Sequence, residues 1–150
     1  MFGQSEGGRM YLGHQMGSLT NERLQWAAQM GVEHIACEDR KTDNIENEDG
    51  TWNVAGLKQA SARAAAWGIK VEIVALNLPS QYMTKQRFPG IMRGLPSRDA
   101  EIEIIKQNIR VTGEAGIDCL KYNLNLLGVP RTGRTKGRGG AMYSHFDISK

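Results

Sequence analysis

Residues 64–76 read Ala-Ala-Ala-Trp-Gly-Ile-Lys-Val-Glu-Ile-Val-Ala-Leu, and this stretch decides the fold. Its first part ends an alanine-rich helical pattern, Gly68 interrupts that pattern, and a run rich in β-branched residues follows. Glycine readily adopts the left-handed conformation that closes a helix, and β-branched side chains favour strands. The stretch therefore predicts a helix, a terminating glycine and a strand, in that order.

The same succession occurs twice more. Ala-Gln-Met-Gly-Val ends at Val32, and Gly-Glu-Ala-Gly-Ile ends at Ile117. Alternating helices and strands are typical of a parallel sheet with right-handed crossovers, so the sequence predicts an α/β fold with four parallel strands. The helices are expected over about residues 21–30, 54–67 and 98–115, and the strands over 10–13, 32–37, 69–76 and 117–124.

The remaining segments are defined by their composition. Thr20, Thr51 or Asn53, and Ser97 stand where helix N-caps are needed. Spacings of three and four predict that the last helix buries Ile102, Ile105, Ile109 and Ala115. Residues 77–96 form a connection long enough to be functional or partly helical. After Leu127 the pattern predicts neither a further helix nor a further strand.

The composition bounds the class of protein. Of 150 residues, 40% are hydrophobic and 23% charged, which is ordinary for a soluble globular domain, and the net charge of +3 is too small to argue for a nucleic-acid partner. No apolar run approaches the ~20 residues of a membrane span, and the polar start lacks a secretory signal. We expect one cytoplasmic domain, with residues 1–9 as a loose lead-in and 126–150 as a substrate-loop-like tail.

Cysteines, histidines and tryptophans have structural interpretations beside the functional ones. Cys37 and Cys119 each sit in an apolar run and are expected to be buried, reduced thiols. The histidines show no metal-binding spacing; His34 is expected to be structural, whereas His14 is a candidate ligand contact. Glu72 is either a partly buried functional carboxylate or a residue on a solvated edge. The three tryptophans are expected to pack helices or anchor loops.

Polar residues gather at the predicted strand ends, where ligands bind both barrels and open parallel sheets. Tyr122 points opposite to Lys121 and Asn123 if this segment is a strand, so one of these two sets faces a pocket. The full strand-end set suits a polyhydroxylated ligand: His14 and Gln15, Glu38 to Arg40, Asn77, and Tyr122 to Asn125.

The segment from Gly128 to Gly140 is basic and rich in glycine. It nearly spells a phosphate-binding loop, but Arg134 replaces the lysine, Pro130 removes an amide, and no helix follows. Three interpretations remain open for its cations: a solvated loop, a clamp for an anionic substrate, and a nucleic-acid contact. Arginine in such a loop can hold a carboxylate through two hydrogen bonds.

Three stretches resemble the mannonate dehydratase family: Tyr-Leu-Gly-His-Gln-Met-Gly from Tyr11, Gly-Ile-Met-Arg-Gly-Leu-Pro-Ser-Arg-Asp from Gly90, and the run from Leu120 to Gly140. The resemblance implies a xylose isomerase-like TIM barrel and a lyase that uses Mn²⁺ or Fe²⁺ to dehydrate D-mannonate to 2-keto-3-deoxy-D-gluconate in hexuronate catabolism. It also implies substrate-binding roles for Tyr122, Asn123, Asn125, Arg131 and His14. The family's metal ligands come from later strands, so no metal ligand is assigned here.

A TIM barrel typically takes about 250 residues and eight strands. The chain is therefore expected to form the N-terminal half of a (β/α)8 barrel, as a fragment inactive by itself or as one of two copies that close a barrel. The expected partners are a sugar acid and, where two copies close the barrel, a second copy of the chain, with neither nucleic acid nor membrane. Two alternatives remain: a sugar isomerase or epimerase on the same scaffold, and a non-catalytic carbohydrate-binding remnant.

Overall fold

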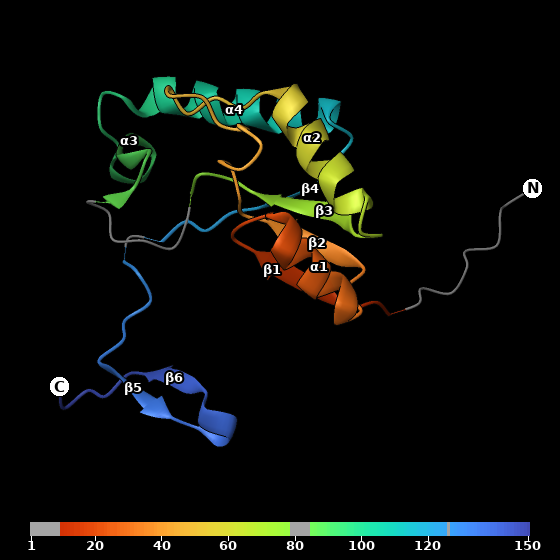
Figure 1. The fold of residues 1–150 in the computed structure, drawn as a ribbon. Coiled ribbons are helices and arrows are strands. Elements are labelled where there is room, and N and C mark those ends of the chain that lie inside the picture. The colour runs from red at the N-terminus through yellow and green to blue at the C-terminus, as the bar shows by residue number, and fades with distance from the viewer. Residues whose placement is uncertain (1–9, 79–84, 126) are drawn as a thin grey trace, which may run out of the picture.

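The computed structural model describes residues 10–78, 85–125 and 127–150. A parallel sheet forms the main body, with strands in the spatial order β1 (Gly13–Met16), β2 (His34–Cys37), β3 (Lys70–Ala75) and β4 (Cys119–Lys121). Helices α1 (Asn21–Gln29), α2 (Val54–Ala65) and α4 (Arg98–Glu114) alternate with these strands, and the short helix α3 (Pro89–Arg93) precedes α4 (Figure 1). The expected α/β fold with four parallel strands is confirmed.

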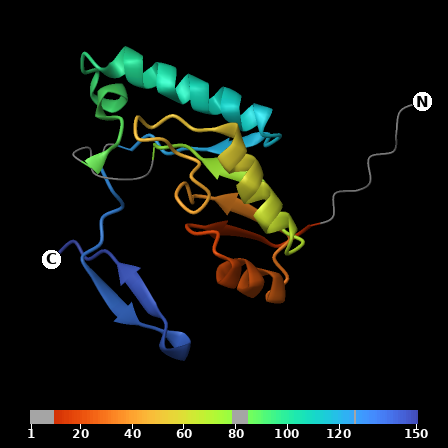
Figure 2. The same cartoon turned by 45° about the horizontal axis from the view of Figure 1, so that its top comes forward.

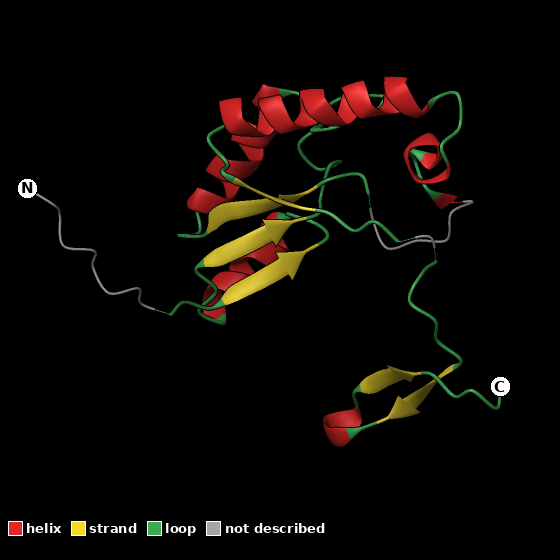
Figure 3. Ribbon diagram, turned by 180° about the vertical axis from the view of Figure 1, so that it is seen from behind, coloured by secondary structure: helices red, strands yellow, loops and turns green. Residues whose placement is uncertain are grey.

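The two faces of the sheet differ. In β2 the side chains of Ile35 and Cys37 are buried among helix residues, whereas His34 and Ala36 on the other face are half-buried. The helices lie on one side of the strands (Figure 2), and Figure 3 looks onto the opposite, uncovered face. In a barrel the uncovered face would be the lumen, so we call it the lumen face.

The helix ends follow the sequence signals closely. Gly31, Gly68 and Gly116 have φ of 77°, 72° and 80°, the left-handed conformation predicted for all three. Asn53 caps α2, because its side chain accepts a 2.7 Å hydrogen bond from the amide of Gly56. Thr20 occupies the N-cap position of α1, but its side chain makes no capping hydrogen bond.

The first strand begins later in the chain than the sequence predicted. Residues 10–13 were expected to form it, but β1 runs from Gly13 to Met16, and Met10 and Leu12 are 95% and 52% exposed. The cause is the pairing with β2: Met16 lies opposite Cys37, so that it enters the hydrophobic core. The burial of Met16, and not the position of the first apolar run, determines which residues form β1.

The buried face of α4 agrees with the expectation only in part, since Ile105 and Ala115 pack against the core as predicted. Ile102 and Ile109 are 37% and 46% exposed, whereas Asn108, Val111 and Thr112 are buried. Asn108 explains why α4 turns a different face toward the core, because its side chain hydrogen-bonds to the backbone of the loop before α2. Ser97 occupies the N-cap position without a capping bond, and its hydroxyl donates to Glu101 instead.

The C-terminal segment contains structure that the sequence pattern did not predict. Strands β5 (Gly133–Lys136) and β6 (Met142–His145) form an antiparallel hairpin with a 3-10 turn, η2 (Arg138–Gly140), set apart from the main sheet (Figure 1). Both strands are largely exposed, so no alternation of apolar residues marks them. Strand β4 is also shorter than the expected run of 117–124.

The two cysteines lie in different environments. Both are free, and Cys37 is buried, but Cys119 is exposed, which corrects the expectation of two buried thiols. The connection after β3 is partly helical as expected, through α3, while residues 79–84 lie outside the described part. Among the described residues, no helix combines the length and apolar character needed to cross a bilayer.

Candidate functional site

Three polar side chains from different strands meet at the C-terminal edge of the lumen face. The ammonium of Lys121 on β4 donates to the side-chain oxygen of Gln15 on β1, and its distance to Glu38 Oε1, just after β2, is 2.9 Å. All three side chains are exposed or half-buried, so they remain in contact with solvent. We call this set the strand-end cluster.

The sheet register explains why these residues converge. Gln15 lies opposite Ala36, Ala36 opposite Ile73, and Ile73 opposite Cys119, which places one row of side chains on the lumen face. The next outward row on that face contains Glu38 and Lys121, because strand side chains alternate between faces. The ends of parallel strands thus bring residues distant in sequence into one polar layer.

A groove of about 710 Å³ opens beside this cluster. Its lining includes the amides of Asn44, Asn47 and Asn77 and the cations Lys41 and Lys85. A smaller cavity of about 240 Å³, lined by Lys121 and Asn123, shares Gly17, Glu38 and Arg40 with it. Cluster, cavity and groove therefore form one continuous polar surface at the strand ends.

An ion-paired wall supports the groove. The Glu46 carboxylate lies between two guanidinium groups, with Arg40 Nε at 3.1 Å and Arg87 Nε at 2.9 Å. Arg40 also donates to the carbonyl of Ala75 at 2.9 Å, and Arg87 donates to the carbonyl of Glu48 at 2.6 Å. These bonds join the loops after β2 and β3, so the groove wall is fixed to the sheet.

Asp39 holds the loops after β1 and β2 together. Its carboxylate accepts hydrogen bonds from the backbone amides of Leu19, Lys41 and Thr42 and from the Thr42 hydroxyl. Burial acts to raise the pKa of this carboxyl, but the hydrogen bonds from Thr42, Leu19 and Lys41 outweigh it and hold the pKa below its ordinary value. Asp39 is thus a charged structural residue under the groove.

A second polar group lies nearer the N-terminal ends of the strands. The Tyr11 hydroxyl donates to Glu72 at 2.9 Å, the Tyr11 ring stacks on His34 at 3.7 Å, and His34 Nδ1 lies 3.1 Å from Glu72. The hydrogen bond to Glu72 raises the pKa of the Tyr11 phenol. His34 is accordingly structural, and Glu72 is a bonded, partly buried carboxylate. In barrels, this end contributes to stability and the other end to chemistry.

The predicted binding residues after β4 separate into two groups. Asn123 is half-buried, lines the smaller cavity and donates its backbone amide to Leu78 at 2.8 Å. Tyr122 points away and is 60% exposed. The carbonyl of Asn125 accepts a 3.5 Å hydrogen bond from the Gln86 side chain. Lys121 and Asn123, and not Tyr122, therefore form the pocket-facing set.

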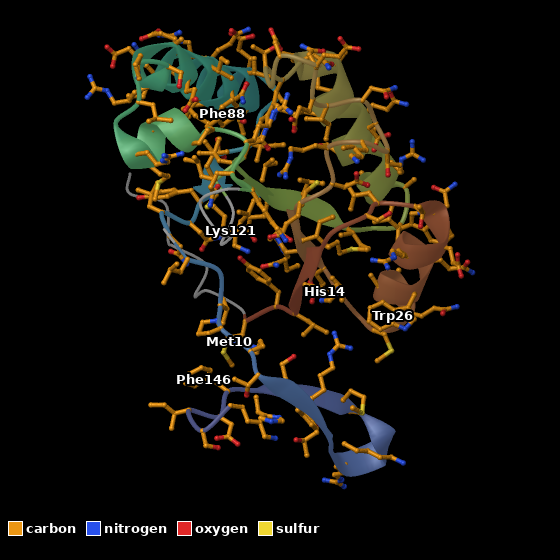
Figure 4. The ribbon with its side chains drawn as sticks, turned by 90° about the vertical axis from the view of Figure 1, so that its left-hand side faces the viewer. Met10, His14, Trp26, Phe88, Lys121 and Phe146 are labelled. Carbon is orange, nitrogen blue, oxygen red and sulfur yellow. The ribbon has the colours of Figure 1, made fainter. Side chains whose placement is uncertain are left out.

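His14 and Arg131 lie away from the strand-end cluster. His14 shares the helix-facing side of β1 with Met16, and its ring centroid is 5.7 Å from that of Trp26, to which it is edge-on (Figure 4). Arg131 is exposed before the hairpin, and its guanidinium donates to the carbonyl of Pro130. Their substrate-binding roles stay predictions, since neither lines the groove or the cavity.

Two residues of the cluster were not singled out from the sequence. Gln15 was only one of many strand-end residues, and Lys121 was noted only for its alternation with Tyr122. The sequence signal that could have identified Lys121 is a charged residue in a predicted strand that is otherwise largely apolar. Its partner, Glu38, lies 83 positions away in sequence, and local patterns do not reveal such a pairing.

The described residues do not by themselves form a divalent-metal centre. Within 10–78, 85–125 and 127–150, no three His, Cys, Asp or Glu side chains gather as potential ligands. At the strand-end cluster, the carboxylate of Glu38 faces an ammonium, which is not a metal ligand. The groups that this polar surface presents are amides, cations and carboxylates.

No protein-family model matches this chain, and no curated protein sequence matches it. Among solved structures, it is similar to a mannonate dehydratase from Streptococcus suis serotype 2, with a TM-score of 0.71 and 20% sequence identity. The likeness covers 95% of this chain but only 38% of that chain, so this chain spans well under half the length of its neighbour. At this identity the likeness concerns the fold.

Proposed function

We propose that this chain supplies substrate-positioning residues of a mannonate dehydratase-type lyase in the cytoplasm, acting on D-mannonate or a closely related sugar acid. The observation that carries the proposal is the strand-end cluster, where Lys121, Gln15 and Glu38 converge from three strands beside the groove. The sequence resemblance and the similar fold of the S. suis enzyme support the choice of substrate.

The chemistry of the cluster suits a sugar acid. The Lys121 ammonium can pair with the substrate carboxylate, exchanging its bond to Glu38 for one to the ligand. The amides of Gln15 and Asn123 can donate to and accept from hydroxyl groups. In the dehydration, the proton beside the carboxylate is removed and the hydroxyl on the next carbon leaves as water, so positioning both carbons is what this surface would contribute.

The Mn²⁺ or Fe²⁺ implied by the resemblance would require ligands outside the described residues, and we derive no step through it. The chain is accordingly proposed to bind substrate and to be inactive by itself. A second copy that covers the lumen face belongs to the same proposal, and analytical ultracentrifugation of the chain tests it.

The function is tested by mass spectrometry of D-mannonate incubated with the chain and Mn²⁺, together with a binding measurement by NMR. Binding without turnover is expected of this chain, and a product lighter by one water would extend the assignment to catalysis. A product of unchanged mass would favour the isomerase alternative. Because the described residues hold no cluster of metal ligands, this binding should be indifferent to Mn²⁺ and chelator. The carbohydrate-binding remnant shares that expectation, and absence of binding would refute the proposal.

A variant tests the role of Lys121. Lys121→Met removes the ammonium but keeps most of the side-chain length, so D-mannonate should bind about tenfold more weakly, the equivalent of ~1.4 kcal/mol. Lys70→Met, an exposed lysine at the start of β3, is the matched control and should bind as the original chain does. Equal affinity of both variants would contradict the assignment of Lys121.

A further inference from the structure

Asn77 presents a buried amide with no partner. The residue is 2% exposed, and both polar atoms of its side chain, Nδ2 and Oδ1, are buried without a hydrogen bond. In the part of the chain that the structure describes, it is the one residue with both polar side-chain atoms in this state. Buried polar groups are nearly always paired, so an unpaired amide of this kind needs an explanation.

The backbone fixes the position of Asn77. The amide of Leu76 donates to the carbonyl of Lys121 at 2.8 Å, and the amide of Asn123 donates to the carbonyl of Leu78 at 2.8 Å. These two bonds extend the β3–β4 pairing on either side of Asn77. Because Ala75 opposes the lumen-facing Lys121, alternation places Asn77 on the same face, where it lines the groove.

The remaining groove groups indicate the ligand chemistry. Arg40 and Arg87 are already bonded to Glu46 and to backbone carbonyls. For the side chains of Lys41 and Lys85, in contrast, the described residues provide no hydrogen bond or ion pair. The groove therefore offers two uncommitted cations and an unpaired amide, which suits a ligand with a carboxylate and several hydroxyls.

We infer that this groove is a binding site for a hydroxylated carboxylic acid, in which the buried side-chain amide of Asn77 hydrogen-bonds a hydroxyl group of the ligand. The sugar-acid class of the ligand rests on the proposed function. The inference adds the groove as the binding site and Asn77 as the residue that recognises a ligand hydroxyl. An amide can donate and accept at once, so one hydroxyl pairs both of its atoms.

Asn77→Leu tests the inference because the change should weaken ligand binding and at the same time increase the stability of the fold. Leucine has a similar volume and no polar atoms, so removing an unpaired buried amide should raise the urea midpoint of unfolding. The same change should weaken D-mannonate binding about tenfold or more. Asn21→Leu, at the exposed start of α1, is the control for binding and should leave the affinity unchanged.

The readout is an NMR titration of the 150-residue chain with D-mannonate, following the side-chain amide signals. The Asn77 signals, assigned by their loss in Asn77→Leu, should shift on titration. D-mannitol, which has the hydroxyls but not the carboxylate, should bind more weakly, because it offers no carboxylate to Lys121 or to the neighbouring Lys41 and Lys85.

The outcomes separate this inference from the proposed function. If the original chain binds D-mannonate and Asn77→Leu binds it equally well, the inference is wrong while the proposed function stands. If Asn77→Leu lowers the urea midpoint, Asn77 is a structural residue and the inference is also wrong. If the original chain does not bind D-mannonate, the proposed function fails and the inference fails with it.

Discussion

Replacing Asn108 by leucine should destabilise the protein more than most single changes. Asn108 lies on α4 and is 0% exposed. Its side-chain oxygen accepts a 2.8 Å hydrogen bond from the amide of Trp52, and its side-chain nitrogen donates a 3.0 Å bond to the carbonyl of Gly50. Leucine fills a similar volume but makes neither bond, so two buried backbone groups lose their partners.

The magnitude follows from those two groups. Each buried, unpaired donor or acceptor costs ~1–3 kcal/mol, or about 4 kcal/mol for both at mid-range. The added apolar surface of leucine returns ~1–2 kcal/mol. The expected net loss is therefore about 2–3 kcal/mol, which lowers the urea midpoint by about 1–1.5 M at a slope of ~2 kcal/mol per M.

Urea unfolding followed by tryptophan fluorescence and by circular dichroism measures this loss. The control is Gln107→Leu, a neighbouring change on the exposed side of α4, which should alter stability by less than ~0.5 kcal/mol. If Asn108→Leu fell within the range of that control, the two hydrogen bonds would not anchor α4 to the loop before α2, and the explanation of the α4 orientation would be refuted.

Three further outcomes follow from the structure. Gly56→Ala should cost more than ~2 kcal/mol because its new methyl group would lie 2.7 Å from a backbone carbonyl oxygen, whereas Gly113→Ala, with open space around it in α4, should stabilise by ~0.5–1 kcal/mol; thermal unfolding distinguishes them. Asp39 has a folded-state pKa below that of the unfolded chain, so its contribution to the free energy of unfolding is complete above about pH 4 and is lost as the pH falls through the folded-state pKa. The free energy of unfolding of Asp39→Asn, measured between pH 2 and 7, should therefore fall less steeply in acid. Burial raises the pKa of Cys37 to about 12 while Cys119 is exposed, so iodoacetamide at pH 8 should label Cys119 alone, as peptide mass mapping would show.

The parts of the fold that the sequence predicted correctly depend on local signals. Strand β3 is rich in β-branched residues, and Gly68 closes the preceding helix whatever packs against it. In contrast, β1 depends on its pairing with β2, and the orientation of α4 depends on the two hydrogen bonds of Asn108. The mostly exposed β5–β6 hairpin carries no buried alternation from which it could be predicted.

The site was predicted only in part for a related reason. Glu38, Asn77 and Asn123 follow well-marked strands, so their place at the strand ends could be inferred. A shift of the strand alters which side chains face the lumen, because side chains alternate with a period of two. With β1 expected at 10–13, His14 followed the strand; in the structure it lies within β1 and faces α1, while Gln15 reaches Lys121.

The strand order β1-β2-β3-β4 has a consequence for biosynthesis. Within the described sheet, each strand pairs only with strands that directly precede or follow it, so none of its three pairings joins strands that are not consecutive in the sequence. As the chain leaves the ribosome, each new helix–strand unit meets an edge that is already formed. The sheet can therefore grow in one direction during translation, with each completed unit serving as the template for the next.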